Sequence, residues 1–161
     1  MAALKKWIQH WGNLIIHIVS ITLCAASFPL TLKLTSSQIQ PIASAISTFS
    51  GILFGFVMAS ITLIASAKSN TLVQNTQRTG YLTKMLGRMH ATMGWLLLVC
   101  IIFILVLFMP DSLKMKNIFL DEPKEILYSQ ITLTIGLYTV LVSFKNFIYT
   151  WFEFKVFTKN M

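Results

Sequence analysis

Four long apolar stretches restrict what this chain can fold into. They span about residues 14–34, 42–67, 92–109 and 127–151. A helix needs roughly 20 mostly apolar residues to cross about 30 Å of hydrocarbon. Transmembrane β-strands alternate apolar and polar residues, and these continuous runs do not alternate. We therefore expect an all-α polytopic membrane protein, a four-transmembrane-helix bundle that forms a single membrane domain over residues 1–161.

The composition indicates that the bilayer is the solvent of this chain. Hydrophobic residues make up 55% of the 161 positions and charged residues 11%, whereas a soluble domain carries about 25% charged residues. A chain this apolar cannot hide its side chains in a core of its own size. Cys24 and Cys100 lie inside apolar stretches without a CxxC pair or histidines at ligand spacing, so neither a zinc site nor a disulfide framework is indicated.

The N-terminal segment has some features of a secretory signal. Lys5 and Lys6 precede the first apolar stretch, and small residues follow at positions 25–27. The apolar run continues past those small residues, which is untypical of a cleavage site. We expect this segment to be retained as a membrane anchor.

Lysine and arginine lie mainly on one side of this topology. That side carries nine cations and the single acid Glu153, which gives 9 − 1 = +8, and the other side carries four cations and four acids. Cytoplasmic loops are enriched in lysine and arginine, which predicts an N-in/C-in protein of the bacterial inner membrane, with a cytoplasmic loop over residues 68–91. Topology then explains the whole net charge, so we expect the lipid bilayer as a partner and no direct contact with nucleic acid. The nine cations are Lys5, Lys6, Lys68, Arg78, Lys84, Arg88, Lys145, Lys155 and Lys159.

The second apolar stretch, which we expect Pro41 to open, contains small residues at four-residue intervals. Such spacing places them in one slowly drifting stripe along a helix, where another backbone can approach closely. Packing against a helix of the same chain explains this stripe, and so does a seam between subunits or a pore-facing wall. The stripe consists of Ala43, Ser47, Gly51, Gly55 and Ala59.

The predicted cytoplasmic loop mixes basic and apolar residues. Gly80 marks a break, after which helical spacing predicts that the third spanning helix begins near Tyr81 and projects into the cytoplasm. This segment is either a basic helix at the lipid headgroups or a docking surface for a cytoplasmic protein. The residues that would make either contact are Arg78, Tyr81, Lys84, Met85 and Arg88.

Ionisable residues within a bilayer are candidates for function. His17 in the first stretch and Lys145 near the cytoplasmic end of the fourth are such intramembrane polar residues. No aspartate or glutamate lies within a predicted span, which counts against a proton-coupled transporter. The fourth stretch also carries polar side chains that could line an aqueous path or bond between helices: Gln130, Thr132, Thr134, Tyr138, Thr139 and Ser143.

The sequence carries no recognisable catalytic constellation. It has no nucleophile–base pair at useful spacing, no glycine-rich phosphate loop and no set of histidines and carboxylates that would bind a metal. We therefore expect no enzymatic activity, no cofactor and no metal ion. The loop over residues 110–124, with alternating charges, either lies against the outer interface or senses a signal there.

Two segments of this chain carry a family resemblance. The sequence SGILFGFVMAS at residues 50–60, followed by TGYL at residues 79–82, resembles the membrane subunit of Kiwa-type anti-phage defence, with the membrane effectors of some retrons next. The resemblance covers roughly residues 42–105. It implies a homo-oligomer in the inner membrane that senses infection, or perturbs the membrane, together with a soluble cytoplasmic partner docked on the basic loop.

Two other functions fit a chain of this kind. Immunity proteins against pore-forming bacteriocins are also small, basic and multi-spanning, and they act through helix contacts. A small channel or holin-like pore is the third alternative. Neighbouring genes would separate the first two, because one predicts a soluble defence protein and the other a toxin.

Overall fold

The structure, a computed structural model, describes residues 2–67, 70–116 and 125–159, and it describes side chains from Leu14 onward except at Leu72 and Lys116. Some charges used for the predicted topology lie outside these described residues or side chains, namely Lys5, Lys6, Lys68, Lys116, Asp121, Glu122 and Lys124.

Four long helices make up most of the chain. They are α1 (Ala2–Thr31), α2 (Ser36–Ser66), α4 (Tyr81–Leu107) and α5 (Tyr128–Lys159), and each contains a segment long and apolar enough to cross a membrane. A short helix α3 (Thr71–Arg78) joins α2 to α4, and strands β1 (Lys114–Lys116) and β2 (Glu125–Leu127) form an antiparallel pair between α4 and α5. The chain is thus a multi-pass membrane protein, as predicted, with a small hairpin added to a helical fold.

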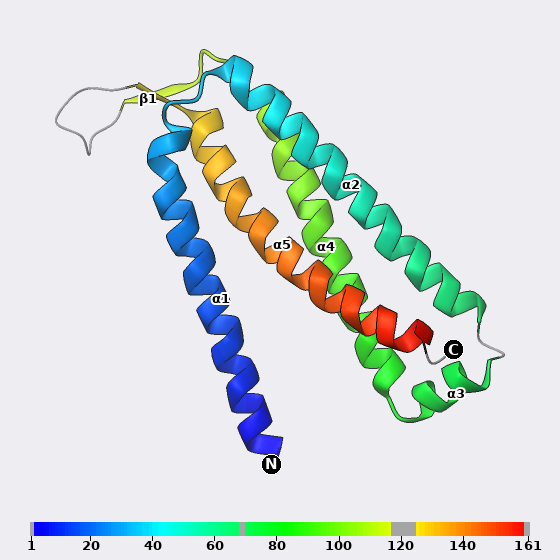
Figure 1. Cartoon of the computed structure of the whole chain (residues 1–161). Helices are drawn as coiled ribbons and strands as arrows, with labels where there is room; N and C mark the ends of the chain where they lie inside the picture. Colours follow the sequence, from blue (N-terminus) through cyan, green and yellow to red (C-terminus); the bar gives the residue numbers. More distant parts are fainter. Residues whose placement is uncertain (1, 68–69, 117–124, 160–161) are drawn as a thin grey trace.

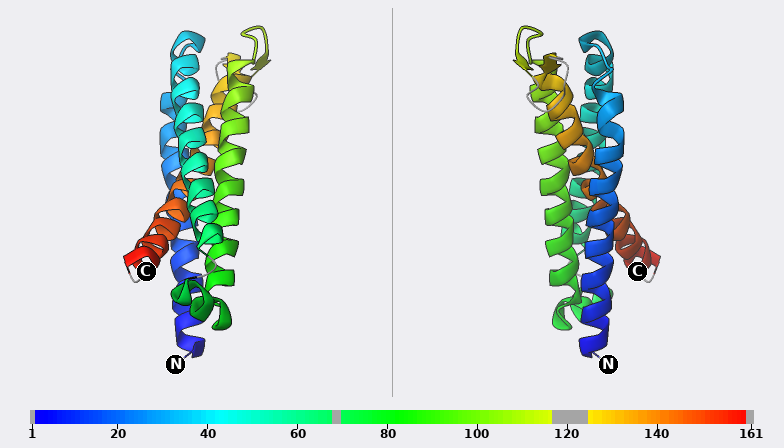
Figure 2. Two further views of the ribbon diagram at one scale, coloured as in Figure 1. Left: turned by 90° about the vertical axis from the view of Figure 1, so that its right-hand side faces the viewer. Right: turned by 90° about the vertical axis from the view of Figure 1, so that its left-hand side faces the viewer.

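The helices form a bundle with an uneven arrangement. α4 lies between α2 and α5, and α1 packs mainly against α5. α1 diverges from the other helices toward its N-terminal end (Figure 1), and α5 leans away from their common direction (Figure 2). Both ends of the chain lie toward the end of the bundle that holds α3, opposite the β-hairpin (Figure 1).

The α2–α4 pair is the most regular contact in the bundle. Buried residues of α4 recur at alternating intervals of three and four positions, and α2 presents a matching series. This is the spacing that lets two helices interlock with a left-handed crossing. The α4 series consists of Leu82, Met85, Met89, Thr92, Leu96, Val99, Phe103 and Val106.

The helix boundaries follow local capping chemistry. α2 begins at Ser36 and not, as predicted, at Pro41, because the Gln38 side chain accepts a hydrogen bond from the Thr35 backbone N–H at 3.1 Å and caps the helix. Gly80, with φ of +71°, precedes α4 as predicted, and this left-handed backbone favours glycine. α5 continues past the predicted end at Trp151 to Lys159.

Little of each spanning helix is buried within the chain. Between 17% and 28% of the residues in each spanning segment are buried. Large apolar side chains such as Ile21 and Leu105 are more than half exposed. Hydrocarbon does not penalise this exposure, so the arrangement depends on the contacts that remain.

Candidate functional site

The small-residue stripe of α2 winds from the bundle interior to its outer surface. Ala43 is fully buried and Ser47 is half-buried, with its Oγ 3.6 Å from the Sγ of Cys100 on α4. A four-residue step turns the helix by about 40° beyond a full turn. The three later members, Gly51, Gly55 and Ala59, are therefore exposed. Packing within the chain accounts for the first part of the stripe and not for the last.

One exposed side of α2 carries small side chains along most of its length. A Cβ added at Gly51 or Gly55 would meet no atom within 4 Å, so no intrachain contact requires glycine at either position. Further small side chains extend the same exposed surface in both directions. We call this set the outer face of α2; it comprises Ser44, Thr48, Gly51, Gly55, Ala59, Thr62 and Ser66.

Hydroxyl groups lie at both ends of the outer face. Thr62 and Ser66 donate to backbone carbonyls of their own helix, to Met58 at 3.0 Å and Leu63 at 2.8 Å. The side-chain hydroxyls of Ser44 and Thr48 make no hydrogen bond within the described part of the chain. A hydroxyl that faces hydrocarbon without a partner is unfavourable, so this end of α2 favours a polar neighbour.

The corner between α3 and α4 holds the residues predicted to dock a partner. Arg78, Tyr81 and Lys84 are exposed, as a docking surface requires. Met85 does not lie on that surface, because it is fully buried in a cluster with Val73 of α3. The side chain of Met85 instead fixes the corner that presents the three exposed residues.

Arg88 connects α4 to α5 at this end of the bundle. Its Nη1 lies 2.5 Å from Oε1 of Glu153. The Nε of Arg88 and the Oε2 of Glu153 are buried without hydrogen-bond partners, so neither atom takes part in the ion pair. Arg88 therefore serves mainly as an interhelix contact, although its side chain as a whole is still 40% exposed.

A polar seam joins α1 to α5. His17 Nδ1 lies 3.0 Å from the Tyr138 hydroxyl, and Thr31 Oγ1 lies 3.0 Å from Thr134 Oγ1. Near the hairpin, Gln130 Nε2 donates to the backbone carbonyl of Leu34 at 2.9 Å and also contacts that of Leu32. Three polar residues of α5 at four-residue spacing thus bond to α1 or to the turn that follows it.

Two other polar residues of α5 bond within their own helix. Thr132 and Thr139 donate to carbonyls of their own helix, and Lys145 is half-buried. The described part of the chain holds no cluster of three or more His, Cys, Asp or Glu residues. Cys24 and Cys100 are both free thiols.

The hairpin end carries its own charged contacts. Lys114 Nζ lies 2.8 Å from Oε2 of Glu125 across the two strands. This pairing lowers the pKa of the Glu125 carboxyl and raises the pKa of the Lys114 ammonium, through the hydrogen bond first and the charge interaction second. Ser36 donates to Asp111 and so ties the start of α2 to the turn that follows α4.

Sequence patterns missed two features of this site. The tyrosine partner of His17 lies 121 positions away, and only the i, i+4, i+8 spacing of Gln130, Thr134 and Tyr138 hinted at a seam. The exposure of Gly51 and Gly55 was also invisible, because hydropathy is high on every side of α2. Comparisons with known protein families, curated proteins and solved structures found no match to this chain.

Proposed function

We propose that this chain is an oligomeric, non-enzymatic subunit of the bacterial inner membrane that acts as a sensor or effector in anti-phage defence with a soluble cytoplasmic partner. The observation that carries the oligomer is the outer face of α2. Its side chains are small and exposed, and no contact within the chain requires glycine at position 51 or 55.

Association through this face follows from the physics of helices in lipid. Hydrocarbon offers no hydrophobic gain when apolar helices meet, so close van der Waals contact and hydrogen bonds drive association. Glycines at positions 51 and 55 let a second backbone approach closely. In a symmetric pair of α2 helices, the unpartnered hydroxyls of Ser44 and Thr48 also gain polar neighbours.

The partner surface in this proposal is the α3–α4 corner. The end of the bundle with α3 faces the cytoplasm when the side rich in lysine and arginine is inside. Arg78, Tyr81 and Lys84 are exposed there on a corner held by buried side chains. A protein with an acidic surface fits these cations. The role in defence rests on the resemblance of residues 50–60 and 79–82.

The polar seam counts against a pore as the primary function. Thr134 and Tyr138 of α5 bond to α1, Gln130 bonds to the turn that follows α1, and none of the three lines an aqueous path within one chain. Bonding between helices was the alternative to a path for this polar stripe. A helix-contact function therefore fits the geometry better than conduction.

Disulfide cross-linking in native membranes tests the oligomer. In a Cys24→Ser, Cys100→Ser background, Ala59→Cys should give a cross-linked dimer on mild oxidation. Ile101→Cys, on an exposed surface of α4, is the matched control and should stay monomeric. Monomer in both variants would refute association through the outer face.

Purification in mild detergent from the native operon tests the partner. We expect a multimer that carries a soluble chain, and the double variant Gly51→Ile, Gly55→Ile should reduce it to a monomer that still folds. A lone monomer for the unaltered protein would instead favour the bacteriocin-immunity alternative, which toxin-protection assays would then examine.

A further inference from the structure

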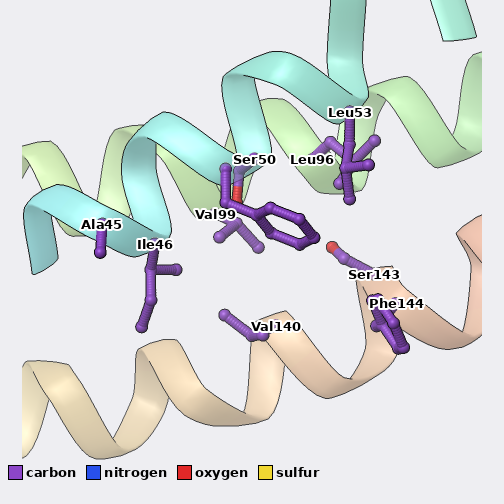
Figure 3. A pocket seen from close by; sticks show the side chains of 10 residues that line it. Ala45, Ile46, Ser50, Leu53, Leu96, Val99, Val140, Ser143 and Phe144 are labelled. Atoms are coloured by element: carbon purple, nitrogen blue, oxygen red, sulfur yellow. The ribbon is translucent and has the colours of Figure 1, made fainter. Parts of the chain in front are cut away.

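An apolar groove runs between α2 and α5, away from the outer face. It consists of two adjoining cavities of about 270 and 370 Å³, which share Leu53 of α2 and Phe144 of α5. Leu96 and Val99 of α4 form the back of the first cavity (Figure 3). Both volumes are close to the lower end of the ~300–1,000 Å³ that small-molecule sites occupy.

The groove opens sideways toward the surrounding bilayer. Several residues that line it are substantially exposed, among them Phe49 at 51% and Ile52 at 65%. Phe56 bridges the second cavity to α5, with its ring centroid 5.3 Å from that of Trp151. Hydrocarbon can therefore enter from the side, and a void here would forfeit dispersion contacts along its walls.

The volumes decide between a lipid chain and a helix as occupant. A helix about 10 Å in diameter fills roughly 800 Å³ for every 10 Å of its length. Each cavity is less than half of that, whereas an acyl chain is only one methylene wide. The groove is thus too narrow to enclose a second helix, whereas its width suits a lipid tail.

Uncompensated positive charge marks one end of the groove. Lys155 follows Ile148 by seven residues and Trp151 by four, which places it on the same side of α5 one turn beyond the groove. It is exposed, and no carboxylate among the described residues pairs with it. The nearby acid Glu153 is engaged by Arg88. A negatively charged headgroup matches this end.

We infer that the α2–α5 groove binds one acyl chain of an anionic phospholipid, whose phosphate lies against Lys155. Aromatic side chains hold the tail, and the lysine selects the headgroup. This site goes beyond the proposed function, because it uses a different side of α2 and does not require the chain to oligomerise.

Native mass spectrometry of the full, delipidated chain in detergent tests headgroup selection. The probes are phosphatidylglycerol and phosphatidylethanolamine with identical acyl chains. One lysine near the headgroup is expected to favour the anionic lipid about fivefold. Lys155→Gln should abolish this preference, and Lys33→Gln, an exposed lysine at the hairpin end, should retain it. Equal binding of the two lipids by the unaltered chain would overturn the inference.

A cavity-filling variant tests the position of the tail. Ser143 is 2% exposed, and its Oγ has no hydrogen-bond partner, so Ser143→Leu fills the first cavity without removing a hydrogen bond. In the same experiment this variant should lose most of its phosphatidylglycerol binding, whereas Ile101→Leu on α4 should keep it. Unchanged lipid binding would overturn the inference. The inference would also fail if Ser143→Leu removed a bound second copy of this chain and not the lipid.

Discussion

Gly136 of α5 lies directly against the Phe103 ring of α4. A Cβ built at this position would lie 2.8 Å from Cε2 and Cζ of Phe103, inside the 3.4 Å at which ordinary contact begins. Phe103 is fully buried, so its ring cannot simply swing into lipid. We predict that Gly136→Ala destabilises the bundle, although alanine is the better helix former.

The magnitude follows from two opposing effects. Relieving the overlap requires the ring or the helix to move by 3.4 − 2.8 = 0.6 Å. Overpacking of this kind costs about 1–3 kcal/mol. The gain from replacing glycine within a helix is about 0.5–1 kcal/mol. Gly94→Ala in α4 isolates the second effect, because a Cβ there meets no atom within 4 Å. The two variants should differ by about 1–3 kcal/mol in unfolding free energy.

Unfolding in mixed micelles of dodecylmaltoside and sodium dodecyl sulfate, followed by circular dichroism, measures this difference. Phe103→Leu in the Gly136→Ala background should recover part of the loss, since the smaller side chain frees the space that the new methyl needs. Equal stability of Gly136→Ala and Gly94→Ala would refute the close approach of α4 and α5.

Two further predictions concern the polar contacts. A double-mutant cycle with His17→Phe and Tyr138→Phe should give a coupling energy of about 0.6–1.7 kcal/mol by the same unfolding assay. Additive effects of the two substitutions would mean that His17 and Tyr138 do not form a hydrogen bond. The Lys114–Glu125 pair should protect the hairpin over a pH window. The contribution of Glu125 is present above its ordinary pKa of 4.5 and is lost as pH falls through its lowered pKa. The contribution of Lys114 is present below its ordinary pKa of 10.5 and is lost as pH rises through its raised pKa. Amide hydrogen exchange of the hairpin, compared with Lys114→Gln, checks this, and the same pH profile in both proteins would contradict it.

Hydropathy predicts the spanning helices of such a chain because the bilayer sets both their length and their composition. The break at Gly80 was predictable for a local reason, since a left-handed backbone favours glycine. The start of α2 was not, because Pro41 is a stronger signal in sequence than the Thr35–Gln38 cap that opens the helix. The hairpin of β1 and β2 also escaped prediction, since three-residue strands carry too little pattern.

It was much harder to predict which side of each helix is buried in the bundle and which side is exposed. In a soluble protein the apolar side faces inward, but here Ile52 is exposed and Ile64 is buried on the same apolar helix. Small-residue spacing identified the stripe of α2, yet the drift that carries Gly51 and Gly55 outward depends on where α4 lies. For the same reason Met85, predicted at a docking surface, is fully buried.

Hydrophobicity does not discriminate between contacts inside a bilayer, so three other properties must decide how this chain packs and what it binds. Backbone access at Gly51 and Gly55 favours a second copy along the outer face of α2. Width and charge favour a lipid in the groove that ends at Lys155. Hydrogen bonding holds α1, whose contact with α5 includes the His17–Tyr138 pair. Since these surfaces lie on different sides of the bundle, a variant in one should leave the other two intact.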